Sequence, residues 1–250
     1  MAHSGKNLES IEKIKTKQGK RYSAGVKLVR EKAPGSVSYD KAIEILCDLP
    51  KTKFDETCDV AFRLGVDPKQ SDQMVRGACV LPHGTGRSAK VIVFAKGEKA
   101  KEAEAAGADE VGAEDLADKI SGGYSDFTAV VATPDMMAVV SKVARVLGPK
   151  GLMPNPKLGT VTMNLKSVIE ELKKGRVEYR VDKNSVIHAP FGKRSFGKEK
   201  LTENLKALTE QVVKAKPATA KGHYLLSMTL STTMGPGVKV DQNQVLAAFQ

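Results

Sequence analysis

Residues 91–107 read VIVFAKGEKAKEAEAAG and join two different patterns. The run Val91–Phe94 contains no polar residue, which is typical of a short strand that is buried on both faces. The residues from Glu98 to Ala106 favour a helix, and Gly107 is expected to end it. A buried strand that leads directly into a helix is the unit from which parallel sheets are built.

The same unit recurs further along the chain. Residues 128–133 read TAVVAT and form a second short apolar run. Pro134 then favours a helix start, and this helix is expected to reach Leu147 and to end at Gly148. Short buried strands that alternate with helices predict a parallel, doubly wound sheet. We therefore expect a small α/β, Rossmann-like domain over residues 84–175.

The segments on both sides of this domain are periodic as well. Helical spacing predicts helices over 20–32, 42–49 and 199–214, the first of them with Tyr22, Val26 and Val29 on one face. Alternation of apolar and polar residues predicts half-buried strands at 60–66 and 224–230. In the second strand, the inward positions are expected to be Tyr224, Leu226, Met228 and Leu230.

Charge is distributed unevenly along this chain, whose formal net charge is +11. Residues 1–32 hold nine basic and three acidic side chains, and residues 176–250 hold twelve and six. Residues 33–83 hold six and eight, and residues 84–175 hold thirteen and twelve. Either the two ends form two basic tails, or they meet in one basic domain of residues 1–83 and 176–250. The periodicity of the ends favours the domain, with only residues 1–18 left as a flexible basic arm.

Composition excludes several classes of protein. Aromatic residues make up 5% of the chain and Trp is absent, which argues against a carbohydrate cleft. Three cysteines without a C-x-x-C pair (Cys47, Cys58, Cys79) favour neither a disulfide framework nor a zinc ribbon, so we expect structural thiols and no metal. The first thirty residues lack the apolar region of a secretory signal, and no apolar run could span a membrane. A cytoplasmic protein without a membrane partner is expected.

A nucleotide-dependent enzyme that uses the α/β domain is one functional hypothesis. The sequence Gly84-Thr85-Gly86 resembles the start of a dinucleotide fingerprint, but it precedes the strand rather than following it, which favours a plain turn. The sequence contains no phosphate-binding loop of the G-x-x-x-x-G-K-[ST] type and no G-x-S-x-G motif. These patterns predict no cofactor and disfavour an enzyme. A basic balance instead favours a polyanionic partner.

Several motifs, taken together, resemble one family. They include two Gly/Pro-rich loops, GPKGLMPNPK at 148–157 and STTMGPG at 231–237. They also include KFDET at 53–57, SDQMVRG at 71–77, LPHG at 81–84 and IHAPFGK at 187–193. In this order and spacing they are similar to the bacterial large-subunit ribosomal protein one family, over about residues 20–240. The Lys-rich extension before residue 19 and a short segment after Val240 depart from the pattern.

The resemblance implies a two-domain protein in which both chain ends build an α+β, RNA-binding first domain and the α/β domain is inserted. It implies a structural role in the large (50S) subunit, where the first domain binds ribosomal RNA at the mobile stalk. The stalk lies beside the exit site, so exit-site tRNA is an expected partner and release of deacylated tRNA an expected role. Many members also bind their own messenger RNA and repress its translation.

The resemblance also implies which residues bind RNA, although local chemistry allows other interpretations. Phe54 could be a core residue, and the turn around Thr233 could simply end a strand. His188 could be a buried structural histidine, but the basic stretch 192–195 suits phosphates. The loop 148–157 could equally be a hinge or an inter-domain contact. The expected RNA-binding residues are Lys53, Phe54, Thr57, Arg180, His188, Lys193, Ser195, Thr232, Thr233, Met234 and Gly235.

Overall fold

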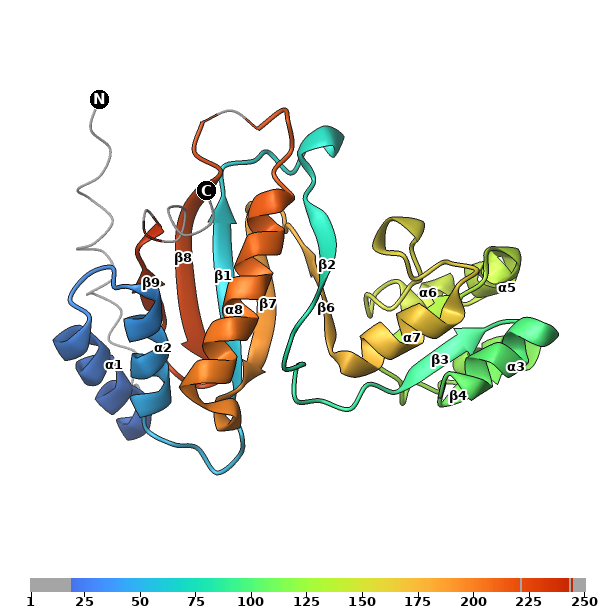
Figure 1. Ribbon diagram of the computed structural model, residues 1–250, viewed down its shortest axis with the longest axis horizontal. Helices are drawn as coiled ribbons and strands as arrows, with labels where there is room; N and C mark the ends of the chain where they lie inside the picture. Colours follow the sequence, from blue (N-terminus) through green and yellow to red (C-terminus); the bar gives the residue numbers. More distant parts are fainter. Residues whose placement is uncertain (1–18, 221, 243, 245–250) are drawn as a thin grey trace.

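We describe the fold from a computed structural model, which covers residues 19–220, 222–242 and 244 (Figure 1). The expected basic arm of residues 1–18 lies outside this range. The described chain forms an α/β structure, as the sequence predicts. It has two lobes, one around a four-stranded sheet and one around a three-stranded sheet (Figure 1). No helix among the described residues is long and apolar enough to cross a membrane.

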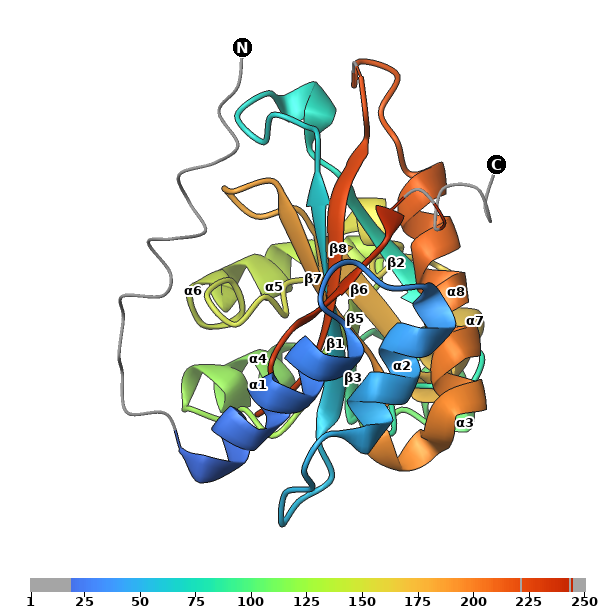
Figure 2. The same cartoon turned by 90° about the vertical axis from the view of Figure 1, so that its left-hand side faces the viewer.

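The larger sheet is antiparallel and has the strand order β7-β1-β8-β9. Helices α2 and α8 lie next to each other on one side of this sheet (Figure 2). The predicted face of α8 is confirmed, because Leu201, Leu205, Leu208 and Val212 are buried. The elements of this sheet are β1 (Thr57–Leu64), β7 (Val186–Lys193), β8 (Leu225–Thr232), β9 (Val238–Val240), α2 (Tyr39–Asp48) and α8 (Gly197–Lys214).

The first helix, α1 (Lys20–Lys32), is confirmed, but its predicted apolar face is only partly buried, with Val29 packed against the larger core. Tyr22 is exposed, and the buried residue of this helix is Gly25. A Cβ atom at Gly25 would lie 3.2 Å from Cδ of Pro236, so the lack of a side chain lets the helix approach the chain after β8. Apolar spacing alone did not show this, since the contact is made by a glycine.

The strand β8 also differs from the prediction at one point. Leu225 is buried and Leu226 is exposed, the reverse of simple alternation. The pairing of β1 with β8 shifts between Arg63 and Leu64, which face Ser227 and Leu225. This irregularity leaves Leu226 without an opposite residue and turns it outward, as an extra residue in one strand does in a bulge.

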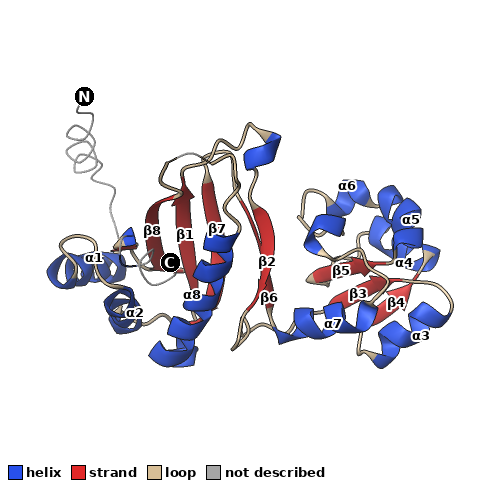
Figure 3. Cartoon of the chain, turned by 45° about the horizontal axis from the view of Figure 1, so that its top comes forward, coloured by secondary structure: helices blue, strands red, loops and turns tan. Residues whose placement is uncertain are grey.

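The smaller sheet is parallel, with the order β4-β3-β5, and confirms the predicted doubly wound pattern. Figure 3 shows α3 and α7 on one side of this sheet and α4, α5 and α6 on the other. The buried residues form a separate apolar cluster on each side. The elements are β3 (Val91–Phe94), α3 (Glu98–Ala105), β4 (Glu110–Gly112), α4 (Glu114–Ser121), β5 (Ala129–Ala132), α5 (Met137–Lys142), α6 (Ala144–Leu147) and α7 (Leu165–Lys174).

Two details of this lobe were not expected. Strand β4 is too short to give a pattern in the sequence. The helix expected over 134–147 is divided into a 3₁₀ turn, Pro134–Met136, and the short helices α5 and α6 on either side of Val143. Val143 is buried, so it faces the core at the point where the helix breaks.

The two lobes are joined by a two-stranded ribbon of β2 (Arg76–Val80) and β6 (Arg176–Arg180). The chain enters the smaller lobe after β2 and leaves it through α7, which ends at Gly175 with φ 101°. At this point a Cβ atom on Gly175 would lie 2.5 Å from Cα of Gly84. The two crossing segments are therefore in backbone contact, and only glycine fits there. Elsewhere in the described part of the chain, short 3₁₀ turns lie at Ser71–Gln73, Pro156–Leu158 and Arg194–Phe196.

We predict that Gly175→Ala destabilises the protein more than Gly123→Ala does. Both glycines have nearly the same φ, 101° and 103°, so both variants carry the left-handed strain of about 1–2 kcal/mol. Nothing lies within 4 Å of a Cβ on Gly123, whereas a Cβ on Gly175 meets backbone. The overlap should add roughly 1–3 kcal/mol in thermal or urea unfolding. Equal losses of unfolding free energy in the two variants would show that the two segments are not in close contact at Gly175.

Candidate nucleic-acid interface

Most of the expected RNA-binding residues meet at one end of the four-stranded sheet. There β1 begins, and β7 and β8 end. Thr57 faces Lys193 across one strand pair, and its neighbour Cys58 faces Thr232 across the other. Antiparallel pairing thus brings together three segments that are far apart in the sequence, namely 51–57, 193–195 and 232–235.

Backbone and hydroxyl groups fasten the first and third segments to each other. The N–H of Thr57 donates to Oγ1 of Thr233 at 3.0 Å, and the N–H of Thr233 donates to the carbonyl of Thr57 at 3.0 Å. Oγ1 of Thr233 in turn donates to that carbonyl at 3.3 Å. The Thr233 hydroxyl therefore closes the end of the strand pair, as well as lying at the surface.

A buried carboxylate, Glu56, lies beneath this end of the sheet with only 1% of its side chain exposed. Arg194 donates to its Oε2 at 2.9 Å. Its Oε1 accepts hydrogen bonds from the backbone N–H of Met234 at 3.2 Å and from Oγ1 of Thr232 at 3.4 Å. Arg21 of helix α1 lies 3.7 Å away from the same oxygen. One side chain therefore connects the 3₁₀ turn after β7, the end of β8 and α1.

Arg194 extends the connection to helix α2. Its guanidinium donates to the carbonyl groups of Cys47 (2.7 Å), Leu49 and Pro50 (3.4 Å), which lie at and just after the end of that helix. Carbonyls at a helix end lack partners within the helix, so a cation there satisfies them. The stretch 192–195 was interpreted as suited to phosphates, but the Arg194 side chain is only 11% exposed and is used internally.

The loop before Glu56 is held from its other side by Asp55. The backbone N–H and the hydroxyl of Ser195 donate to the two carboxylate oxygens of Asp55 at 3.1 and 2.7 Å. Nζ of Lys193 donates to the carbonyl of Asp55 at 3.3 Å. Loop 51–56 is thereby fixed between the ends of β7 and β8.

The fixed loops display two apolar side chains to solvent. Phe54 and Met234 are each 53% exposed, although both are large and hydrophobic. The neighbouring lysines, Lys51 and Lys53, are also exposed. Apolar and basic groups on rigid loops form a surface that can contact both the bases and the phosphates of a nucleic acid.

Two expected residues, Thr57 and Thr232, lie inside this scaffold. Thr232 is 3% exposed and donates to Glu56, whereas Thr57 is 8% exposed and accepts from Arg87 at 3.3 Å. Their side chains are engaged inside the protein rather than facing solvent. Gly235 is half-buried, and its N–H donates to the carbonyl of Thr232 in the same turn at 3.0 Å.

His188 and Arg180 lie apart from this cluster. His188 is exposed in β7 opposite Ala61, about 16 Å along the strand from Lys193. Arg180 is exposed at the end of β6, opposite Arg76. The sheet face that carries His188 also presents Arg63, which the sequence patterns did not single out. This face is a second polar and basic surface, next to the cluster.

The three cysteines are free thiols. Burial raises the pKa of Cys58 to about 12, and it also raises the pKa of Cys47 and Cys79. A thiol with a raised pKa stays protonated near neutral pH and is a poor nucleophile and metal ligand. Among the described residues, no group of three or more His, Cys, Asp or Glu side chains is arranged to bind a metal ion.

Sequence reasoning missed Glu56, Arg194 and Arg21 as members of the site. A glutamate directly before a buried strand is the signal that could have drawn attention to position 56. Its partners could not be identified, because they lie 138 and 176 residues further along the chain.

The chain matches the model of a known protein family. The model of the Ribosomal protein L1p/L10e family matches residues 44–236. The matched range covers most of the chain, including loop 51–57, the end of β7 and most of the turn after β8.

We predict that Glu56→Gln destabilises the protein by roughly 3 kcal/mol or more, because two arginines lose their buried counter-charge. The matched control is Glu44→Gln, which removes an exposed glutamate that lies 3.5 Å from Lys198. A surface pair of this kind contributes at most about 1 kcal/mol. Urea unfolding measures both variants. A loss for Glu56→Gln as small as that of the control would contradict the structural role of Glu56.

Proposed function

Because this chain belongs to the Ribosomal protein L1p/L10e family and is therefore a structural, RNA-binding ribosomal protein, we propose that it binds large-subunit ribosomal RNA through the surface around Phe54 and Met234. The observation that supports this surface is the exposure of two large apolar side chains on loops that Glu56 and Asp55 fasten. The alternative of a nucleotide-dependent enzyme has no support from this family.

We also propose that RNA affinity resides in the lobe built from residues 1–83 and 176–250. Its sequence segments hold nearly all of the excess positive charge, since residues 84–175 have thirteen basic and twelve acidic side chains. Neutralising phosphates with lysine and arginine releases counterions, which is the main source of affinity for RNA. The apolar cluster of this lobe draws its residues from 33–81 and 177–240, in agreement with one packed unit.

Each part of the surface suits a different part of the RNA. Phe54 offers a ring for a base or ribose, and Met234 offers a polarisable chain that adapts to an uneven surface. Lys51, Lys53 and Lys193 suit phosphates. Because the loops are held in place before binding, little conformational entropy is lost when RNA docks.

Two finer roles follow from the resemblance to the stalk protein. The less basic lobe, residues 84–175, is free to contact exit-site tRNA and to assist release of deacylated tRNA while the other lobe stays on ribosomal RNA. A messenger RNA that folds like the ribosomal site would present the same shape to the Phe54 and Met234 surface, so repression of the protein's own message needs no second site. The first role places the protein on the 50S subunit, whereas repression needs protein that is not bound to ribosomal RNA, and both roles belong to the cytoplasm.

We predict that Met234→Ala and Lys53→Gln weaken RNA binding in different ways. Met234→Ala should cost about 1–3 kcal/mol on the cognate RNA, with an unchanged salt dependence, because a base or ribose contact is lost. Lys53→Gln should weaken binding to all RNAs alike and lower the salt slope by about one unit. Affinities measured over a salt series on cognate and scrambled RNA separate the two effects.

Leu226→Ala is the matched control for this experiment. Leu226 is a 43% exposed apolar residue in the same strand as Thr232, close to the opposite end of β8. Its replacement should leave both RNA affinities unchanged. If Leu226→Ala weakened cognate binding as much as Met234→Ala, the effect would be a general one of strand β8, and the proposed surface would be wrong.

A further inference from the structure

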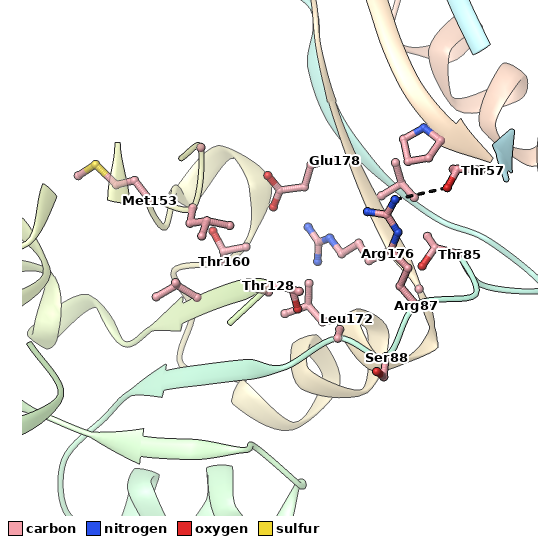
Figure 4. A pocket seen from close by; sticks show the side chains of 18 residues that line it. Thr57, Thr85, Arg87, Ser88, Thr128, Met153, Thr160, Leu172, Arg176 and Glu178 are labelled. Carbon is pink, nitrogen blue, oxygen red and sulfur yellow. Dashed lines mark hydrogen bonds between the residues drawn. The ribbon is translucent and has the colours of Figure 1, made fainter. Parts of the chain in front are cut away.

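A cavity of about 510 Å³ lies between the two lobes, and Thr57 at the start of β1 is among the residues that line it, whereas Phe54 and Met234 are not (Figure 4). Its walls come from Thr57 of β1 and Pro190 of β7, from the segment that enters the smaller lobe, from β5, from the Gly/Pro loop 148–157, and from α7 and β6. Small-molecule sites in proteins commonly have volumes of about 300–1,000 Å³ and lie between domains. Neither the charge distribution nor the proposed RNA surface accounts for this space.

Arg176, the first residue of β6, projects into the cavity (Figure 4). Its side chain is only 9% exposed. One terminal nitrogen donates to Glu171 at 2.9 Å and the other to the carbonyl of Leu158. The third nitrogen, Nε, is buried and has no hydrogen-bond partner among the described residues. Arg176 therefore contributes a buried guanidinium to this wall of the cavity.

The rest of the wall offers complementary groups. Arg87 lines the cavity, and its side chain has one hydrogen bond to the described residues, to Thr57 at 3.3 Å, which leaves other N–H groups for a ligand. Leu152, Met153 and Leu172 form an apolar part of the wall. Glu178 lines the same space, and burial raises the pKa of its carboxyl group. The cavity therefore combines two cations, an apolar wall and one hydrogen-bond acceptor.

We propose that this cavity binds one nucleotide unit. Its phosphate accepts from N–H groups of Arg87 near the positive charge of Arg176, its base lies against Leu152, Met153 and Leu172, and a base amino group donates to Glu178. Arginine suits this role because its planar guanidinium matches phosphate oxygens. A phosphate ion alone would leave most of the volume empty. The unit could be a free nucleoside monophosphate or an unpaired nucleotide of a bound RNA, since both present the same groups.

The test is calorimetric titration of the full-length protein with AMP in phosphate-free buffer. AMP should bind saturably, and adenosine, inorganic phosphate and purine riboside 5′-monophosphate, which lacks the amino group, should each bind less tightly. Arg87→Gln should weaken AMP binding about tenfold, the effect of one charge-assisted hydrogen bond. Lys96→Gln, which removes an exposed charge outside the cavity, is the control and should change nothing.

Repeating the titration on the protein saturated with its cognate RNA identifies the source of the nucleotide. If the affinity for AMP is unchanged, the ligand is a free nucleotide. If AMP no longer binds and Arg87→Gln weakens RNA binding, an RNA nucleotide occupies the cavity. No saturable binding of AMP, equal losses for Arg87→Gln and Lys96→Gln, or adenosine binding as tightly as AMP would each overturn the proposal. Failure of the proposed RNA surface would leave the AMP titration of the free protein unaffected.

Discussion

The carboxylate of Glu56 is the contact on which the arrangement of this protein's exposed loops depends. It is almost completely buried, and it is hydrogen-bonded or paired to groups from the 3₁₀ turn after β7, the end of β8 and helix α1. Through Arg194 it also reaches the end of α2. A buried ion pair adds little net stability compared with apolar residues, yet it tolerates the loss of neither partner. The Glu56 carboxylate instead fixes the geometry, because each group that bonds to it has to occupy one position.

Around Glu56, the residues that support the loops can be told apart from the residues that face solvent. Thr57 and Thr232 lie inside with their hydroxyl groups engaged, while Phe54 and Met234 point outward on the same short segments. Residues that are close in the sequence thus differ in role, because one supports the loop and the other faces solvent. The backbone of the loops that carry these exposed side chains is held in place by hydrogen bonds, so little conformational entropy of the loops would be lost when a partner binds.

The elements of this fold with strong local patterns could be predicted from the sequence. Val91–Phe94 and the apolar face of α8 are examples, because a run or a period within one segment determines which residues are buried. Features that depend on a partner segment could not be predicted. Leu226 turns outward because of its pairing with β1, Gly25 is buried because Pro236 lies against it, and Arg194 turns inward because Glu56 is there. For the candidate site, the motifs located the loops, but they could not distinguish supporting residues from exposed ones.

The central claim is that Glu56 holds Met234 in position for RNA. A double-mutant cycle of Glu56→Gln and Met234→Ala, with cognate RNA affinity measured well below the melting temperatures of all variants, tests it most directly. If Glu56 positions Met234, removing Met234 from the Glu56→Gln protein should cost about 1 kcal/mol less than removing it from the unmodified protein. Losses that simply add would contradict the claim, because Met234 would then bind RNA independently of the buried carboxylate.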